Sequence, residues 1–157
     1  MNKSSAPSID IETLPGHDIR RLHQIAVAIF LQETAEAGLT PVQYAAMQTV
    51  RNRPGIDQRT LARTIGFDTS TIGGVIDRLE ARGLIVRNLS PADRRVRLLT
   101  ISEAGLALIE NATPAVLRAQ ERMLEPLPRR ERAEFLRMLR SLVTANNDLS
   151  RAPSEVA

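Results

Sequence analysis

Three arginines stand close together near the middle of the chain, where they could bind an anionic partner. Residues 87–105 read RNLSPADRRVRLLTISEAG, and Arg94, Arg95 and Arg97 follow the turn-forming SPAD. Arginine presents a planar fork of donors that matches phosphate groups and base edges. Apolar residues flank the turn, so we expect a β-hairpin whose tip and returning strand carry fixed positive charge.

The positive charge of the chain is concentrated around this turn. The 157 residues carry a net charge of +3. The segment from Pro41 to Gly105 has ten basic and six acidic residues, a net charge of +4, whereas the remainder carries −1. All ten basic residues of the segment are arginines. This distribution favours a polyanionic partner such as nucleic acid.

The composition excludes several classes of protein. Hydrophobic residues make up 43% and charged residues 25% of the chain, which is typical of one globular domain. The longest apolar run, IAVAIFL, is too short to span a membrane, and the N-terminus lacks the apolar core of a secretory signal. The chain has no cysteine, hence no disulfide framework. We expect a cytoplasmic protein with no membrane partner.

The sequence also argues against an enzyme. It contains no phosphate-binding loop, no dinucleotide-binding glycine motif and no G-x-S-x-G. Its two histidines, His17 and His23, lie on different faces of the expected first helix, and no cysteine can join them around a metal ion. We therefore expect neither a metal nor a cofactor.

Hydrophobic periodicity and capping residues predict six helices. Gly38 and Gly83 end two of them, Thr40 opens another, and Asp57 and Asp68 cap the next two. The expected ranges are 16–37, 41 to about 50, 57–65, 69–82, 102–124 and 129–148. The runs LIVRNL and VRLLTI are β-prone and predict the two strands of the hairpin.

The central elements predict a winged helix. Helices 57–65 and 69–82 are joined by a short turn that contains Gly66, which is the arrangement of a helix-turn-helix, and the hairpin follows directly. The expected fold class is mainly α with a small β-hairpin. We expect one domain over 15–149, with its winged helix-turn-helix lobe at about 41–105, and flexible tails at 1–14 and 150–157.

The remaining helices, at about 16–37 and 102–148, carry apolar stripes that one small lobe cannot cover. Ile19, Leu22 and Phe30 lie on one face of the first helix, and Leu142 and Val143 on one face of the last. We expect these N- and C-terminal dimerisation helices to pack against a second copy in a two-fold homodimer. A dimer presents two recognition helices, which suits a palindromic site.

The chain resembles the MarR family of bacterial transcription regulators from about His17 to Val143. The resemblance rests on LTPVQYAAM, on TLARTIGFDTSTIGGVIDRLEARGLIVR through the helix-turn-helix, and on SPADRRVRLLTISEAG through the wing. Its most distinctive part is the D-x-R element at Asp93 and Arg95. The resemblance implies a homodimer that binds a pseudo-palindromic double-stranded DNA operator and is commonly released by a small aromatic carboxylate or phenol.

The wing is expected to contact DNA in two ways. Its tip reaches the minor groove, where we expect Arg95, while Arg94 and Arg97 contact phosphates. Asp93 is expected to orient an arginine, either Arg95 in the wing or Arg78 on the recognition helix; Arg78 could instead contact the DNA backbone. The alternative is a solvated turn with a surface ion pair worth at most ~1 kcal/mol.

The helix-turn-helix supplies the other expected DNA contacts. Hydroxyl groups at a helix N-terminus suit phosphates and base edges, and small residues allow close approach to the groove. The residues concerned are Thr69, Ser70, Thr71 and Gly73 on the recognition helix, with Arg59 and Arg63 on the preceding helix as phosphate candidates. Thr69 and Ser70 could serve as caps alone, and the two arginines could form an ordinary solvated face.

A second cluster, GHDIRRLHQ, marks the first helix. Arg20 lies beside histidines and an apolar stripe, a combination that suits a planar carboxylate, and the resemblance implies an effector pocket near the first and second helices. The expected ligand-binding residues are His17, Arg20, His23, Gln24, Gln43, Tyr44 and Met47. The alternative is that the arginines pair with Asp18 or with acids of a partner copy, and that His23 is an interface residue.

We therefore expect a ligand-responsive homodimeric repressor that binds operator DNA and is released by a small aromatic acid. Two alternatives stay open: a winged-helix DNA-binding protein without a ligand, constitutive or architectural, and a protein-docking module. Three arginines on one wing argue against docking. The modest net charge of +3 argues against general DNA compaction.

Overall fold

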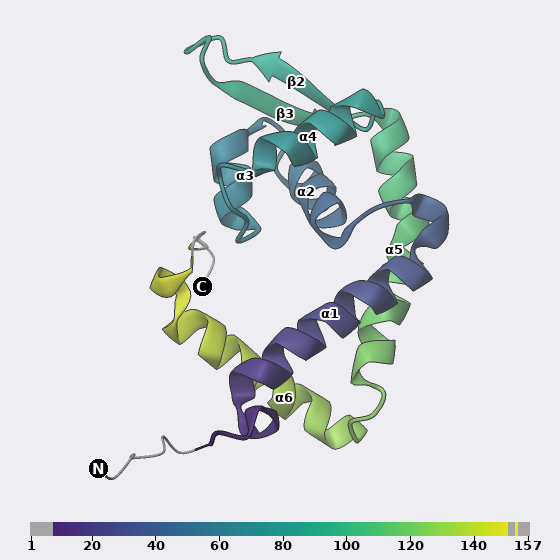
Figure 1. Cartoon of the computed structure of the whole chain (residues 1–157). Helices are drawn as coiled ribbons and strands as arrows, with labels where there is room; N and C mark the ends of the chain where they lie inside the picture. The colour runs from purple at the N-terminus through teal and green to yellow at the C-terminus, as the bar shows by residue number, and fades with distance from the viewer. Residues whose placement is uncertain (1–7, 151–152, 154–157) are drawn as a thin grey trace, which may run out of the picture.

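The computed structural model describes residues 8–150 and residue 153, which form six α-helices and a three-stranded sheet (Figure 1). The helices are α1 Pro15–Glu33, α2 Pro41–Asn52, α3 Gln58–Thr64, α4 Ile72–Ala81, α5 Glu103–Leu124 and α6 Arg129–Ala145. The strands are β1 Ile56–Asp57, β2 Ile85–Leu89 and β3 Arg97–Ile101, and the 3-10 turns are η1 Ile11–Thr13, η2 Ala35–Ala37 and η3 Asn147–Leu149. The expected fold class is confirmed.

The elements form two groups (Figure 1). The helices α2, α3 and α4 with the sheet make up a lobe from which the β2–β3 hairpin protrudes. The helices α1, α5 and α6 lie beyond the lobe, and α6 is at the opposite end of the molecule from the hairpin. Glu33 ties α1 to α5 through ion pairs with Arg118 at 3.5 Å and Arg122 at 3.1 Å.

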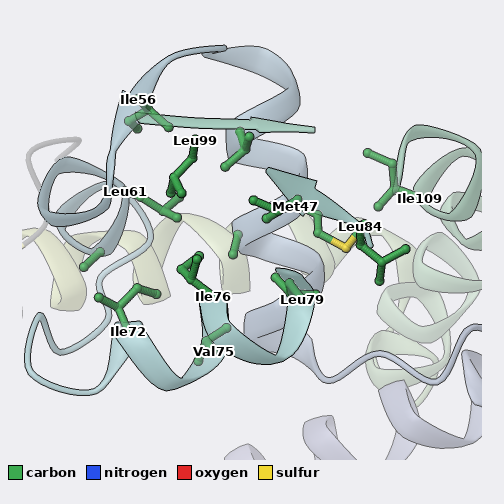
Figure 2. Packing of buried hydrophobic residues seen from close by; sticks show 14 of the residues in the cluster. Met47, Ile56, Leu61, Ile72, Val75, Ile76, Leu79, Leu84, Leu99 and Ile109 are labelled. Carbon is green, nitrogen blue, oxygen red and sulfur yellow. The ribbon is translucent and has the colours of Figure 1, made fainter. Parts of the chain in front are cut away.

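A cluster of buried hydrophobic side chains forms the core of the lobe (Figure 2). The apolar residues expected on the inner face of the recognition helix, Ile72, Val75, Ile76 and Leu79, are all buried. Met47 from α2 is fully buried among them, with 0% of its surface exposed. Ile109 of α5 joins the same cluster, so α5 begins as part of the lobe and continues beyond it.

The starts of α2, α3 and α5 are fixed by side-chain caps at the expected positions. The Thr40 hydroxyl accepts a hydrogen bond from the Gln43 backbone N, while the Gln43 side chain accepts one from the Thr40 N, a complete capping box before Pro41. Asp57 caps α3 by accepting from the Thr60 N at 2.9 Å. Ser102 caps α5 by accepting from the Gly105 N at 3.0 Å.

The sheet has one strand more than the expected hairpin. Its order is β1-β3-β2, all antiparallel, and Ile56 of β1 pairs with Leu99 of β3. No strand was expected before the helix that begins at Asp57. Gly55, with φ at +83°, does turn the chain, but its N then donates to the Leu99 carbonyl at 2.8 Å and starts the pairing. A two-residue strand is too short for periodicity to predict.

Two expected helix bounds in the first half of the chain were wrong. The recognition helix α4 begins at Ile72 rather than at residue 69, because the Asp68 carboxylate accepts from the Ser70 N at 2.7 Å and favours a turn over residues 69–71. Asp68 is therefore not its N-cap; Thr71 occupies that position. The first helix ends at Glu33 rather than at residue 37, because the chain tightens into η2, whose end Gly38 has a φ of +58°.

The two ends of the chain also differ from the expected ranges. Within the expected N-terminal tail, residues 11–13 form η1, capped by Asp10. The last helix ends at Ala145, and the chain then forms η3 rather than continuing to residue 148. The expected tails otherwise fall largely on residues 1–7, 151–152 and 154–157, which lie outside the described residues.

Candidate nucleic-acid interface

Four of the ten central arginines are engaged in holding the protein together. Each donates a hydrogen bond to a group on another element or loop. The pairs are Arg51 with Glu110, Arg53 with Thr64, Arg82 with the Gly38 carbonyl, and Arg87 with Glu80 and Asp77. The positive charge of the segment is thus divided between structural arginines and those on the outer surface.

Arg87 is the most strongly engaged of these. Its Nε and Nη2 donate to Glu80 Oε2 at 3.0 and 2.7 Å, and Nη2 also pairs with Asp77. The hydrogen bond that Arg87 donates to Glu80 lowers the pKa of Glu80, and the same bond, together with the one that Arg87 donates to Asp77, raises the pKa of Arg87. From the sequence, Arg87 was considered only as part of the positive charge. Asp77 and Glu80, three residues apart on one face of a helix, were the available sign that an arginine would pair with them.

An open cleft of about 740 Å³ lies between α3, the turn before α4 and the wing. Five of the residues expected to contact DNA line it: Arg59, Arg63, Thr69, Arg95 and Arg97. They come from α3, from the turn before α4 and, more than twenty residues further along the sequence, from the wing. The fold therefore brings four arginines to one concave surface, which could bind the phosphate backbone of a nucleic acid.

Asp57 brings a carboxylate to the same cleft, but it is occupied as the cap of α3. Burial raises the pKa of Asp57, and the hydrogen bonds from the Thr60 hydroxyl and the Thr60 and Arg59 backbone outweigh this effect and lower it overall. The carboxylate stays ionised and fixes the start of α3, the helix that carries Arg59 and Arg63.

The wing holds its arginines on a short ordered turn. The Ser90 N donates to the Val96 carbonyl at 3.0 Å, and Asp93 Oδ1 accepts from the Arg95 backbone N at 2.9 Å and from Arg95 Nε at 3.3 Å. Of the two arginines considered for Asp93, the structure pairs it with Arg95 and not with Arg78. The Arg95 side chain is nevertheless 92% exposed.

The remaining expected DNA contacts lie on the outer surface or at its edge. Arg94 on the wing and Arg78 on α4 are exposed, as are Thr69, Ser70 and Thr71 in the turn before α4. Gly73 is half-buried, and a Cβ atom there would lie 3.3 Å from Gln58 Nε2, so its small size also serves the packing of α4 on α3. Gly73 stays a prediction as a DNA contact.

The residues expected to bind a ligand fall into two separate groups. On α1, Arg20 Nη2 lies 3.5 Å from His17 Nδ1, and His23 and Gln24 are exposed. The α2 group is engaged within the lobe: the Gln43 side chain caps α2, and Met47 is in the core. In the part of the chain that the structure describes, no hydrogen bond or ion pair joins the two groups.

Tyr44 faces the junction of the two groups of elements. Its hydroxyl lies 3.0 Å from the Thr113 hydroxyl on α5, and its ring makes an edge contact with Phe30 of α1, with 6.2 Å between the centroids. Tyr44 also packs against the core cluster that contains Met47. Tyr44 of the expected pocket therefore contacts both α1 and α5.

A second cleft, of about 560 Å³, was not anticipated from the sequence. It lies between the end of α1 with η2 and the middle of α5, and Glu33, Asn111 and Arg118 are among its lining residues. None of the seven residues expected to bind a ligand lines it. The cleft arises where two helices that are distant in the sequence lie side by side, which periodicity does not reveal.

The described residues contain neither a candidate metal cluster nor a candidate membrane-spanning helix. Across residues 8–150 and 153, no group of three or more histidine, aspartate or glutamate side chains could hold a metal ion. No helix in this part of the chain is both long and apolar enough to cross a lipid bilayer.

Comparison with known sequences gives a consistent family. The family model described as "MarR family" matches residues 39–96, which cover the lobe from the start of α2 through the wing tip. The HTH-type transcriptional repressor NicR of Pseudomonas putida is 28% identical over 156 residues, which cover 94% of this chain and 99% of NicR.

Solved structures with the same fold include regulators bound to DNA or regulated by a small molecule. PcaV of Streptomyces coelicolor, solved with its natural ligand, has a TM-score of 0.82 at 34% identity and covers 89% of this chain and 99% of its own. BpsR of Bordetella bronchiseptica, whose DNA binding is regulated by 6-hydroxynicotinic acid, has a TM-score of 0.81 at 30% identity, covering 87% and 97%. The repressor CouR, bound to a 23-mer DNA duplex, has a TM-score of 0.80 at 31% identity, covering 89% and 99%.

Proposed function

The chain belongs to the MarR family of DNA-binding transcription regulators, which are not enzymes, and on this premise we propose that it is a homodimeric repressor released from its operator by a small aromatic acid. The observation that carries the DNA-binding part is the arginine-lined cleft between α3 and the wing. A regulator of transcription works beside the chromosome, so the proposal includes a cytoplasmic location.

The proposed DNA-binding mode uses the three segments around that cleft. The turn before α4 and the start of α4, with Thr69, Ser70, Thr71 and Gly73, face the major groove, and Arg95 at the wing enters the minor groove. Arg59, Arg63, Arg78, Arg94 and Arg97 contact the phosphate backbone. The fixed hold of Asp93 on Arg95 supports this mode, because it limits the orientations of an otherwise exposed side chain.

The proposed homodimer is supported by apolar side chains that one copy leaves uncovered. On α1, Ile19 is 57% exposed, and on α6, Leu142 is 57% exposed and Val143 is 61% exposed. The helix α6 has no buried residue at all. A second copy related by a two-fold axis would cover these faces and present two recognition helices about one turn of DNA apart.

The proposed effector site lies near His17 and Arg20 on α1 and is completed by the second copy. A guanidinium 3.5 Å from an imidazole offers donors to a planar carboxylate, and both side chains sit beside the apolar face that the dimer would cover. His23 and Gln24 are the adjacent polar groups. In this proposal the lobe of the second copy supplies the opposite wall, with its Tyr44 backed by Met47 and by Gln43 at the start of α2.

The experiment that tests the proposal is operator binding by the full chain. DNA that flanks the gene of this protein is titrated in a gel-shift or fluorescence-anisotropy assay at two salt concentrations, with and without a panel of hydroxybenzoates and hydroxynicotinates. Specific binding should exceed non-specific binding by about 10³-fold or more at the same salt. Binding that no acid disturbs would retain the DNA-binding function and remove the effector.

A further inference from the structure

The end of the recognition helix is tied to the segment that joins α1 to α2. Arg82, the C-cap residue of α4, donates from Nη1 to the Gly38 carbonyl at 2.8 Å and from Nη2 to the Ala37 carbonyl at 3.2 Å. The guanidinium fork thus binds two successive carbonyl groups that are more than forty residues away in the sequence. The acceptors are neutral backbone carbonyl groups, so the charged guanidinium forms these hydrogen bonds without an acidic side chain.

The segment that receives these bonds is a short and well-fixed connection. The Thr34 hydroxyl donates to the Phe30 carbonyl at 2.8 Å, Gly38 closes η2 in the left-handed region, and Leu39 is buried. Thr40 then caps α2. Residues 34–40 are therefore a rigid strap between α1 and the lobe, and a displacement at one end is transmitted to the other.

The residues next to Arg82 hold the other connection between the lobe and the dimerisation helices. The Ser102 hydroxyl donates to the Gly83 carbonyl at 2.6 Å, and the Ser102 N donates to the Leu84 carbonyl at 3.2 Å. The corner formed by Arg82–Leu84 therefore contacts both chain segments that lead out of the lobe, one toward α1 and one into α5.

The same strap forms one wall of the 560 Å³ cleft beside α5. Residues 34–37 line this cleft opposite Leu108, Asn111 and Arg118. A change in the separation of α1 and α5 would move the strap, and the strap is bonded to the recognition helix through Arg82. Arg82 thus links the orientation of α4 to the geometry of α1 and α5.

We propose that Arg82 is a positioning residue for operator binding, which latches the recognition helix to the 34–38 segment and so fixes its orientation relative to α1 and α5. The inference rests on the proposed two-fold operator complex, in which that orientation sets the distance between the two recognition helices. Arg82 itself contacts no DNA in this arrangement. It transmits to α4 any rearrangement of the dimerisation helices.

The test compares Arg82→Ala with two controls. Arg82→Lys keeps the positive charge and loses the fork, whereas Arg53→Ala removes a guanidinium that bonds to Thr64 within the lobe. Thermal unfolding of each variant checks that the fold is kept. Affinity is measured for an operator with its natural half-site spacing, for the same operator lengthened by one or two base pairs, and for an isolated half-site.

A latch predicts a pattern that a loss of charge does not. Arg82→Ala should bind the natural operator about fivefold more weakly or worse, should lose much of the penalty for altered spacing, and should bind the half-site as the parent chain does. Arg82→Lys should resemble Arg82→Ala, and Arg53→Ala should keep the parental spacing penalty. A parental spacing penalty in Arg82→Ala would overturn the inference.

A second readout separates the latch from the function proposed above. The chain has no cysteine, so Asn88→Cys in the lobe and Gln120→Cys on α5 allow spin labels at two exposed sites. The distance distribution within one chain, diluted with unlabelled copies, should broaden in Arg82→Ala and not in Arg53→Ala. Distance distributions of equal width in Arg82→Ala and the parent chain would overturn the latch. A broadened distribution in Arg82→Ala, together with no specific DNA binding by the parent chain, would overturn only the proposed function.

Discussion

The Asp93 carboxylate and the Arg95 guanidinium form an ion pair within a single turn of the wing. Asp93 Oδ1 accepts from Arg95 Nε at 3.3 Å and from the Arg95 backbone N at 2.9 Å, so it fixes both the backbone and the root of the side-chain fork. The two terminal nitrogens of Arg95 have no hydrogen-bond partner among the residues that the structure describes. An exposed pair of this kind adds little stability. Its effect is to orient the Arg95 side chain.

Arg95→Ala should therefore weaken operator binding without destabilising the fold. The expected loss is about 1–3 kcal/mol, or roughly 5- to 150-fold in Kd, together with a shallower dependence of log Kd on log salt. Fluorescence anisotropy at several salt concentrations measures both, and thermal unfolding provides the check on the fold. Asp93→Asn is the companion variant: it adds positive charge but releases Arg95, and tighter specific binding by it would contradict the orienting role.

Arg20→Ala should leave operator binding intact and blunt release by an aromatic acid. Arg20 lies beside His17 at 3.5 Å on α1, remote from the wing, so its loss removes a donor for a carboxylate and no DNA contact. The concentration of acid that halves operator occupancy should rise at least tenfold, because a charged hydrogen bond contributes about 1.5–3 kcal/mol. Arg21→Ala on the same helix is the matched control. An unchanged acid response in Arg20→Ala would remove this residue from the site.

Glu80→Gln should flatten the dependence of stability on pH in the acid range. The hydrogen bond from Arg87 lowers the pKa of Glu80 below its ordinary 4.5 in the folded state. Its stabilising contribution is therefore present above pH 4.5 and is lost as the pH falls through the lower, folded-state pKa. Urea unfolding at pH 7, 4.5 and 3.5 should show a smaller acid-induced decrease of the midpoint for the variant than for the parent chain. Parallel decreases would show that Glu80 does not titrate differently on folding.

Gly105→Ala should be strongly destabilising. A Cβ atom at Gly105 would lie 2.1 Å from the Leu84 carbonyl oxygen, a backbone atom that cannot turn aside. The start of α5 would have to separate from the corner after α4, at an expected cost of about 1–3 kcal/mol or more. The control is Gly74→Ala, where the new methyl group meets nothing within 4 Å inside α4, so we expect a gain of about 0.5–1 kcal/mol. Urea unfolding measures both, and equal stabilities would contradict the close contact.

Much of the fold could be predicted from the sequence because its determinants are local. The buried face of α4 follows from the spacing of Ile72, Val75, Ile76 and Leu79, and the caps at Thr40, Asp57 and Ser102 are short-range hydrogen bonds. At the start of α4, where the prediction was wrong, a competing local hydrogen bond decided the structure. Asp68 was expected to cap a helix, and the carboxylate instead stabilises the turn that delays α4 to Ile72.

The site could be predicted less completely, because the role of an arginine depends on which group it contacts in the folded protein. Arg87 and Arg82 have the same composition signal as Arg94 and Arg97, yet the first two are bonded to α4 and to the strap while the others face outward. Only the tertiary fold distinguishes them. The surroundings of the expected ligand-binding residues could not be predicted for a similar reason. His17 and Arg20 lie at an apolar surface that a second chain covers in the proposed dimer.

In the proposed function, the protein is a DNA-binding repressor whose affinity for its operator is controlled by a small aromatic acid. The most direct measurement is the dissociation constant for the DNA that flanks its own gene, at fixed salt, with increasing concentrations of hydroxybenzoate or hydroxynicotinate. We expect tight, salt-sensitive binding that one such acid abolishes, and we expect Arg20→Ala to make that binding resistant to the acid. Operator binding that no acid alters would contradict ligand control, and the absence of any specific binding would contradict the proposed repressor.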